Sequence, residues 1–325
     1  METALQERMT GAAGTPLSCL PSLPILALPL LLSVFIVLPS LHLNPLLGAE
    51  AWKTDRKPKV FGDRIPVKLL TPANRKVQRK ISYYHNFFRS RVSPPASDML
   101  SMSWHKGAAR AAQKWANRCL MLTHDDVHGR WTDDYGSCGQ NIFISTHQVP
   151  WFFAIKTWFM ERHNFTYGSS RNDLYVVGHY TQMVWASTHK VGCGFARCPA
   201  PPLQIPRKTA RLRRHGRGGG YRALSAPPAT RKTYYSYICN YCPIGNFVER
   251  LGKPYKKGEP CTGCPNHCRH NKLCTNSCPV ADLWVNCGDL NTTWHNWLCN
   301  NGDTTEGLER QKSCKATCTC GGRII

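Results

Sequence analysis

Hydrophobic residues recur at helical spacing in three segments of the chain, residues 73–92, 104–119 and 151–162. A proline pair at 94–95 predicts the end of the first helix, and Pro150 predicts the start of the third. The recurring apolar positions of the first two segments are Val77, Ile81, Tyr84, Phe88, Ala108, Ala112, Trp115 and Cys119.

Two other segments follow the pattern of β-strands. Residues 190–198 and 234–241 alternate in polarity or are rich in β-branched and aromatic side chains. Since helices and strands mix without strict alternation, the pattern predicts an α+β sandwich.

The segment between these strands, residues 199–233, is rich in proline, glycine and arginine and poor in apolar residues. A segment of this composition buries too little apolar surface to offset the entropy lost on ordering. We therefore expect a disordered basic loop at the tip of a hairpin. Two interpretations stay open: a loop that binds polyanions or is clipped by proteases, and an insertion without a role.

Ten of the seventeen cysteines lie in the last sixty-five residues, where leucine, isoleucine and valine are too few to build a core. Disulfides in an oxidising compartment and zinc thiolates in the cytosol are the two explanations. The C-x-x-C pairs at 239/242 and 261/264 are compatible with either.

The N-terminus favours disulfides. Residues 20–47 form an uncharged apolar run that ends at the small residues Gly48-Ala49, so residues 1–49 are expected to be a signal peptide of a secreted, extracellular protein. A signal anchor is the alternative, since the run is long enough to span a bilayer, although its prolines disfavour a membrane helix. Removal of the signal leaves sixteen cysteines, an even number that allows complete pairing.

The formal net charge of +23 is unevenly distributed. Residues 51–80 and 199–233 together supply +17 of it, which predicts basic flanking segments around folded parts that are only mildly basic. This pattern disfavours a nucleic-acid-reading domain. Outside the cell it favours heparan-type glycans and cell surfaces as partners, with a merely solvated linker as the alternative.

Several motifs then occur in order along the chain. They are 85-HNFFRSRVSPPASDMLSMSW-104, 113-QKWANRC-119, 138-CGQNIF-143, 178-GHYTQMVWAST-188 and 236-SYICNYCPIGNF-247. Together they resemble the CAP superfamily of cysteine-rich secretory, antigen 5 and pathogenesis-related proteins. The run 261-CTGCPNHCRHNKLCTNSCPVADLWVNC-287, with 314-CKATCTC-320, resembles the cysteine-rich domain of the cysteine-rich secretory proteins.

The resemblance implies an α-β-α sandwich followed by a small disulfide-rich helical module. The implied organisation is a basic lead-in at 50–72, a CAP domain at 73–247 interrupted by the insertion, a hinge at 248–260 and a cysteine-rich domain at 261–325. The implied disulfides are Cys119–Cys198, Cys138–Cys242, Cys193–Cys239, Cys261–Cys268, Cys264–Cys274, Cys278–Cys320, Cys287–Cys314 and Cys299–Cys318.

In this superfamily a central cleft is lined by two histidines and two acidic residues, and the matching positions are His124, Gln140, Glu161 and His179. Imidazoles and a carboxylate suit Zn²⁺, so His124, His179 and Glu161 are candidate metal ligands. His128 is a fallback for His124. Gln140 stands where many members have glutamate, and its amide is expected to be a plain cleft residue or to orient a histidine.

The same residues disfavour catalysis. Thr181 and Ser187 lie near His179 in the sequence, but neither has a third partner that would complete a nucleophile and base pair. We therefore expect a protein that is not an enzyme. The alternative for the cleft is a pair of hydrogen-bonded histidines that hold no ligand.

The tail resembles a fold shared with potassium-channel-blocking toxins, which implies that an ion channel or another cell-surface protein is the partner. The candidate contacts are Trp284, Trp294, Trp297, Lys272 and Arg269, with internal packing expected for at least one tryptophan.

Two other functions stay open. One is binding of a sterol or lipid beneath an apolar loop at residues 142–153, which is alternatively an ordinary lead-in to a helix. The other is adhesion through glycans. Sequons at Asn164 and Asn291 predict glycosylation, and a glycan on Asn164 would narrow access to the cleft.

Overall fold

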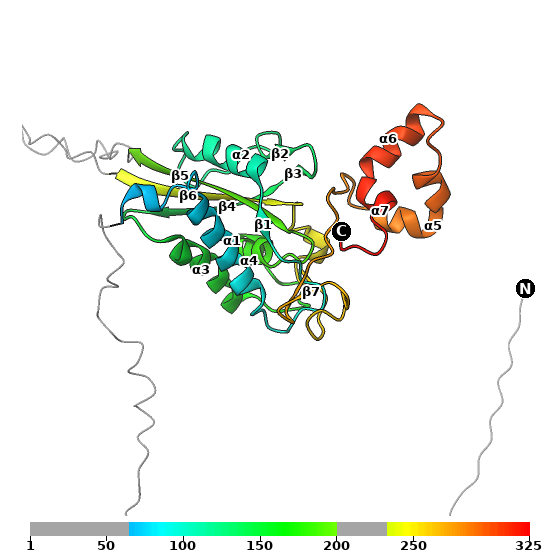
Figure 1. Cartoon of the computed structure of the whole chain (residues 1–325), viewed down its shortest axis with the longest axis horizontal. Helices are drawn as coiled ribbons and strands as arrows, with labels where there is room; N and C mark the ends of the chain where they lie inside the picture. Colours follow the sequence, from blue (N-terminus) through cyan, green and yellow to red (C-terminus); the bar gives the residue numbers. More distant parts are fainter. Residues whose placement is uncertain (1–64, 200–232) are drawn as a thin grey trace, which may run out of the picture. The chain divides into compact units, whose positions relative to one another are not determined.

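A computed structural model describes residues 65–199 and 233–325 of the chain (Figure 1). The expected signal peptide, most of the basic lead-in and nearly all of the 199–233 insertion lie outside the described residues. Within the described ranges, no helix combines the length and the apolar character needed to cross a bilayer.

Four strands form the central sheet, in the order β1 (Ser103–Trp104), β5 (Lys190–Pro199), β6 (Thr233–Cys242) and β4 (Gly139–Ser145). The predicted strands are β5 and β6, which pair antiparallel along their whole length. Their register sets Cys193 opposite Cys239, and these two residues form a disulfide. Both ends of the insertion are therefore held by the sheet.

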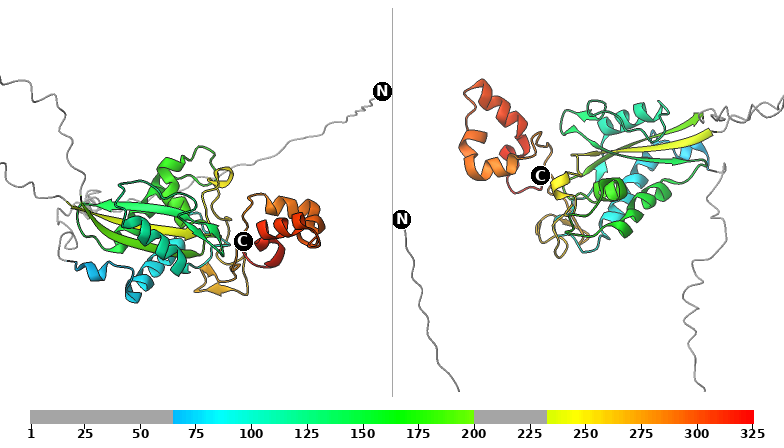
Figure 2. Two further views of the ribbon diagram at one scale, coloured as in Figure 1. Left: turned by 90° about the horizontal axis from the view of Figure 1, so that it is seen from above. Right: turned by 180° about the vertical axis from the view of Figure 1, so that it is seen from behind.

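Four helices enclose this sheet from its two faces, as Figures 1 and 2 show. One face carries α2 (Lys106–Ala116), and the other carries α1 (Arg75–Arg89), α3 (Trp151–Met160) and α4 (Leu174–Met183). The expected three-layer α-β-α sandwich is confirmed.

The two faces of the sheet bury separate apolar clusters. On the α2 side, Ala112 and Trp115 pack against Ile142 and Ile238 of the sheet. On the opposite side a larger cluster joins the three other helices to the sheet through residues that include Ile81, Ile155, Tyr180, Tyr237 and Tyr241. Removal of this apolar surface from water stabilises the fold, by about 25 cal/mol for each Å².

Glycines in β5 explain how closely α2 approaches the sheet. A Cβ on Gly192 would lie 2.2 Å from the backbone nitrogen of Ala109, and one on Gly194 would lie 2.5 Å from that of Gln113. Because the two positions are separated by one residue, both face α2. Any larger residue at either position would move the helix away from the strand.

The three predicted helices are confirmed, with shorter bounds. Helix α1 begins after Asn74, whose side-chain oxygen accepts from the backbone N–H of Lys76, and α2 begins after His105, whose Nδ1 accepts from that of Ala108. Helix α4 was not predicted. Its apolar residues occupy exposed as well as buried positions, since Leu174, Tyr175 and Val176 are exposed, so it lacks a clear amphipathic stripe.

A buried guanidinium ties α1 to the C-terminal end of α4. The side chain of Arg89 donates to the carbonyl oxygens of Leu100, Met183, Trp185 and Ala186, at distances of 2.7–3.0 Å. Burial lowers the pKa of Arg89 to about 9, yet the group remains charged at neutral pH. These bonds orient the helix that carries His179.

Residues 261–325 begin with a small hairpin, β7 (Cys268–Arg269) and β8 (Leu273–Cys274). The backbone of Cys274 is bonded to Met99 and Ser101 of the sandwich at 2.8 Å each. Three helices follow, which are α5 (Cys287–Cys299), α6 (Thr305–Ser313) and α7 (Lys315–Thr319). The expected disulfide-rich helical module is thus confirmed.

Cystines supply most of the interior of this helical module. Its two buried clusters contain Leu298 and Ala316 as their only fully buried members other than cysteine, within the part of the chain that the structure describes. Eight disulfides join cysteines of the described ranges, and each pairs the two cysteines that the family resemblance implies.

The remaining short elements are β2 (Trp131–Thr132), β3 (Gly136–Ser137) and the 3-10 turns η2 (Val67–Leu69), η3 (Glu161–Asn164) and η5 (Val248–Arg250). Of these, η3 matters most for function because it carries Glu161 next to α4.

Candidate functional site

His179 lies on α4 and is held by Glu161 of η3. Its Nδ1 lies 2.5 Å from Glu161 Oε1, while Glu161 Oε2 accepts the backbone N–H groups of His179 and Tyr180 at 2.9 and 3.0 Å. The ring also stacks on Trp158, with centroids 6.3 Å apart. Since a carboxylate only accepts, we assign the proton to Nδ1, which leaves the lone pair on Nε2.

His124 is held in the same way by Gln140 of β4. Gln140 Oε1 accepts the backbone N–H of Asp125 at 3.0 Å, which identifies this atom as the amide oxygen. The Nδ1 of His124 lies 3.0 Å from the same oxygen and must therefore donate to it. Gln140 Nε2 donates to Asn240 Oδ1 at 3.0 Å on the neighbouring strand. His124, too, keeps its Nε2 lone pair.

Partial burial of its ring is the main reason that the pKa of His124 is lowered, with smaller contributions in the same direction from Arg130 and His179. The hydrogen bond to Gln140 acts in the opposite direction. At neutral pH the imidazole is therefore uncharged, which is the form that binds metal ions.

The predicted cleft residues thus meet as two pairs, His124 with Gln140 and His179 with Glu161. Both oxygens of Glu161 are used by His179 and Tyr180, so its role in this structure is to position the ring. The fallback residue His128 is not needed, because His124 is the histidine that bonds Gln140.

The most compact group of potential metal ligands among the described residues consists of three cysteine sulfur atoms. Those of Cys261, Cys264 and Cys274 lie within 4.8 Å of one another. All three are in disulfides, however, and a metal ion binds the free thiolate. No other group of at least three histidine, cysteine or acidic residues in the described ranges is as compact.

The threonine hydroxyl two residues after His179 is bonded to other groups. Thr181 Oγ1 lies 2.7 Å from Asn246 Oδ1 and 3.1 Å from the carbonyl oxygen of Val177. Neither of these acceptors has the basicity of an imidazole, so neither can activate the hydroxyl as a nucleophile.

The three tail tryptophans are all exposed, by 40% for Trp284, 57% for Trp294 and 45% for Trp297. The expectation that at least one is packed inside the module is therefore wrong, because cystines fill that space. Trp294 and Trp297 contact each other edge to face, with centroids 6.4 Å apart, and the guanidinium of Arg310 lies 4.2 Å from the centroid of Trp297.

The two predicted basic contacts lie elsewhere. Arg269 and Lys272 belong to the β7–β8 hairpin, and Arg269 lines a depression together with residues of α1 and β1. The hairpin is a different element from α5, which carries Trp294 and Trp297, and the role of the two cations as channel contacts stays a prediction. The sequence analysis did not predict that a hairpin precedes the helices of the tail.

The apolar segment 142–153 is only partly a loop. Residues 142–145 belong to β4, where Ile142 is buried against α2, and residues from Trp151 onward belong to α3. Of the two interpretations left open for this segment, the structure supports the lead-in to a helix, with residues 146–150 joining β4 to α3. The segment gives the lipid alternative no support.

Both sequons lie in the described part of the chain. Asn164 is exposed at the end of η3, three residues after Glu161. Asn291 lies within α5, is half-buried, and accepts from the ring of His295 at 2.7 Å. Asn164 is thus the more accessible acceptor.

Two supporting residues, Asn240 and Trp158, were not among the predicted site residues. Asn240 stands opposite Gln140 in the sheet register and fixes its amide, and Trp158 stacks on His179. Asn240 is the one amide side chain in β6, and this was the available signal.

Comparison with known proteins gives consistent matches. The model described as "CAP: Cysteine-rich secretory protein family" matches residues 83–202, and the "Crisp" model matches residues 261–325. Cysteine-rich secretory protein 2 of Cavia porcellus is 40% identical over 252 residues, which are 76% of this chain and 85% of that protein. Cysteine-rich venom protein VAR5 of Varanus acanthurus is 38% identical, over 68% of this chain and 86% of that protein.

Solved structures match as well. One is titled "Crystal structure of NaASP2 with Zn2+", with 26% identity, a TM-score of 0.44, and coverage of 62% of this chain and 96% of that chain. Another is titled "Structure of BmVAL-1", with 23% identity, a TM-score of 0.45, and coverage of 63% and 96% respectively.

Proposed function

We propose that this chain, which belongs to the cysteine-rich secretory protein family, is a secreted protein that modulates an ion channel through residues 261–325. The word secretory in its relatives' names and the eight disulfides both support an extracellular location. A relative named as a venom protein supports an action on other cells.

The exposed tryptophan pair carries the channel proposal. Large aromatic side chains with an adjacent arginine are typical of the residues that dominate binding energy at protein interfaces. Here Trp294, Trp297 and Arg310 meet on a module whose helices are joined by disulfides. A rigid module loses little conformational entropy when it binds, so these side chains are already arranged for contact.

The proposed mechanism is steric. The module would contact the outer vestibule of a channel with Trp294 and Trp297 as anchors, and Arg310 would face acidic groups there. Block would then require no chemical step, in keeping with a protein that is not an enzyme.

Patch-clamp recording with the full secreted chain tests this proposal. We expect current through a sensitive channel to change with the parent protein and to change far less with a Trp294→Ala/Trp297→Ala variant. Tyr175→Ala is the matched control, since Tyr175 is 97% exposed on α4. Equal effects of the tryptophan variant and the parent protein would contradict the proposed contact surface.

We also propose that the cleft binds a divalent metal ion, with Zn²⁺ as the candidate. The supporting observation is that both histidines keep Nε2 free while Glu161 and Gln140 hold their Nδ1 atoms. His124 and His179 would supply nitrogen ligands, and water would complete the coordination. Calorimetric titration with Zn²⁺ should give heat that disappears in His179→Ala, and identical isotherms would refute the site.

A further inference from the structure

Two shallow depressions on the sandwich share part of their lining and form one groove. The first, of about 650 Å³, runs along α1, and the second, of about 500 Å³, lies between α1 and α2. Arg75, Gln78 and Trp104 line both. Because Trp104 belongs to the edge strand β1, this α1–α2 groove follows the edge of the sheet.

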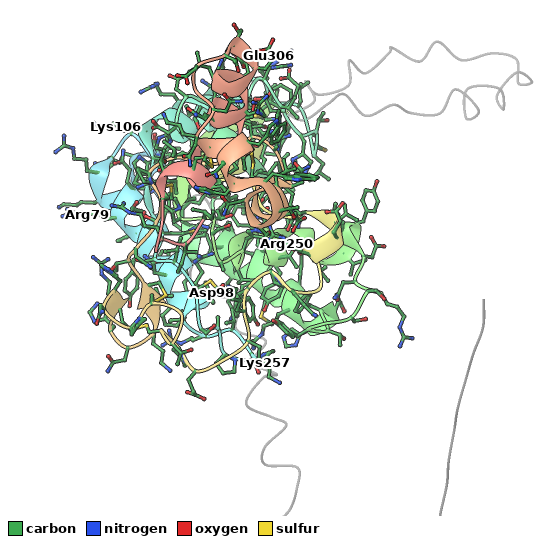
Figure 3. The ribbon with its side chains drawn as sticks, turned by 90° about the vertical axis from the view of Figure 1, so that its right-hand side faces the viewer. Arg79, Asp98, Lys106, Arg250, Lys257 and Glu306 are labelled. Carbon is green, nitrogen blue, oxygen red and sulfur yellow. A yellow bond between two sulfur atoms is a disulfide. The ribbon has the colours of Figure 1, made fainter. Side chains whose placement is uncertain are left out.

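The groove is basic along its length. Arg75 and Arg79 project from α1, Lys106 and Arg110 from α2, and Arg269 from the β7–β8 hairpin, while neither depression is lined by any aspartate or glutamate. Figure 3 shows Arg79 and Lys106 extending outward at the same side of the protein.

These cations have no acidic partner in the part of the chain that the structure describes. None of the ion pairs between described residues includes a cation of the groove. Residues 65–124 contain eleven lysines and arginines and a single acidic residue, Asp98. Asp98 accepts the backbone N–H of Lys256, and Figure 3 shows it apart from Arg79 and Lys106.

The helical repeat explains why the charges line up. Arg75 and Arg79 are four residues apart on α1, as are Lys106 and Arg110 on α2, so each pair repeats after about 6 Å on one helix face. The opposite faces carry buried residues such as Val77 and Ala112. The same amphipathic pattern that builds the core therefore leaves two rows of cations outside it.

This arrangement also corrects an expectation about charge. The charge of residues 51–80 was predicted to belong to a basic flanking segment. Arg75 and Arg79 of that range instead lie on α1 and line the groove.

We propose that the α1–α2 groove is a binding site for a sulfated glycosaminoglycan chain. A linear polyanion presents negative charge at regular intervals, which matches cations spaced along a groove. The half-buried Trp104 supplies an apolar surface for a sugar ring.

A glycan chain fits this site better than a membrane surface. Proteins that bind anionic bilayers combine cations with apolar side chains that insert beneath the headgroups. Here the cations line a hollow, and its aromatic residue, Trp104, lies within the lining. The groove contains neither Trp294 nor Trp297, so this proposal does not depend on the proposed channel contacts.

The test compares two variants of the full secreted chain that lose the same charge. The groove variant is R79Q/K106Q, and the control is R171Q/K156Q, which removes one exposed arginine and one exposed lysine from outside the groove. Immobilised heparin is the probe, with binding measured from 0.1 to 0.5 M NaCl. Equal melting temperatures establish that all variants are folded.

The groove variant should bind heparin more weakly and with a smaller salt dependence. If each contact contributes about 0.7 to the slope of log Kd against log salt, as for single-stranded nucleic acids, two lost contacts reduce the slope by about 1.4. The control should stay near the parent slope. Equal slopes for the two variants would overturn the proposal.

A second measurement uses the unaltered protein. Heparin should protect Lys106 from acetylation by an amine-reactive ester, read by mass spectrometry, while Lys156 should react as it does without heparin. Unprotected Lys106 would overturn the proposal. A loss of binding by R79Q/K106Q to phosphatidylserine vesicles, with heparin binding unchanged, would overturn it in favour of a membrane surface.

Discussion

Glu161 bonds His179 twice, through the Nδ1 of the ring at 2.5 Å and through the backbone N–H of the same residue at 2.9 Å. The position of the ring is therefore fixed both through its Nδ1 atom and through the backbone of the helix that carries it. This double attachment makes Glu161 the positioning residue of the proposed metal site.

Replacement of Glu161 by glutamine should weaken zinc binding about 10- to 100-fold, because residues that orient a metal-binding histidine have effects of this size. An amide has one oxygen and cannot accept all three of the present bonds. Calorimetry with Zn²⁺ gives the affinity, and NMR of the His179 ring nitrogens reports the change of tautomer. Asp173→Asn is the control, since Asp173 caps α4 away from the ring. Unchanged affinity and tautomer in E161Q would refute this role.

Gln140→Glu should raise the pKa of His124, since a carboxylate next to the ring favours its protonated form. It should also lower stability, by about 1–3 kcal/mol, because the Nε2 bond to Asn240 is replaced by two facing oxygens. Histidine NMR titration and urea unfolding measure the two effects. A pKa of His124 that is lower in Gln140→Glu than in the parent protein would contradict the bonding assigned here. So would a variant that is as stable as the parent protein although the Asn240 amide has not rotated.

Acidification should destabilise the sandwich through two buried histidines. Burial lowers the pKa of both His85 and His189 from 6.5 to about 4. As the pH falls from about 6.5 to about 4, the unfolded chain gains a proton at each histidine and the folded protein does not. The free energy of unfolding therefore decreases over this range, by up to about 3 kcal/mol for each histidine.

Urea unfolding at several pH values between 7 and 4 measures this loss. The exposed His147 offers a control, because His147→Gln should leave the slope of stability against pH unchanged. Constant stability down to pH 4 would mean that the two rings are not buried as neutral groups.

Loss of the Cys287–Cys314 disulfide in the tail should destabilise its module by more than the entropy of loop closure predicts. In the chain-entropy model, Cys287–Cys314 and Cys119–Cys198 contribute about 3.5 and about 4.5 kcal/mol, respectively. Cys287 and Cys314 are also most of the buried cluster around Leu298, so Cys287→Ser/Cys314→Ser should unfold the helical module.

Limited proteolysis with mass spectrometry compares the two losses. We expect cleavage within residues 281–325 of the tail variant under native conditions, whereas Cys119→Ser/Cys198→Ser should melt at a lower temperature but resist cleavage in that region. If the two variants resist cleavage equally within residues 281–325, the module has a buried core that does not depend on its disulfides.

Glycosylation should occur at Asn164 in chain secreted from cultured mammalian cells. Asn164 is exposed at the end of a short turn, whereas the half-buried Asn291 lies within a helix with its side-chain oxygen bonded to His295. Asn164→Gln should remove the mobility shift caused by glycosidase, and Asn291→Gln is the matched comparison. A shift lost only in N291Q would reverse the assignment.

The sequence by itself determined the local elements and their means of stabilisation. Apolar spacing predicted α1, α2 and α3, alternation predicted the β5–β6 hairpin, and the cysteine-rich tail predicted a module held by disulfides. Each of these follows from neighbouring residues, because helical and strand periods are properties of a single segment.

Tertiary structure decided which segments meet. Gln140 and Asn240 are one hundred residues apart, yet the sheet register sets them opposite each other and thereby fixes His124. Packing also left all three tail tryptophans exposed, placed Arg269 beside α1, and aligned the cations of α1 and α2 in one groove. The physical reason is that such contacts depend on how whole elements pack, which no local period encodes.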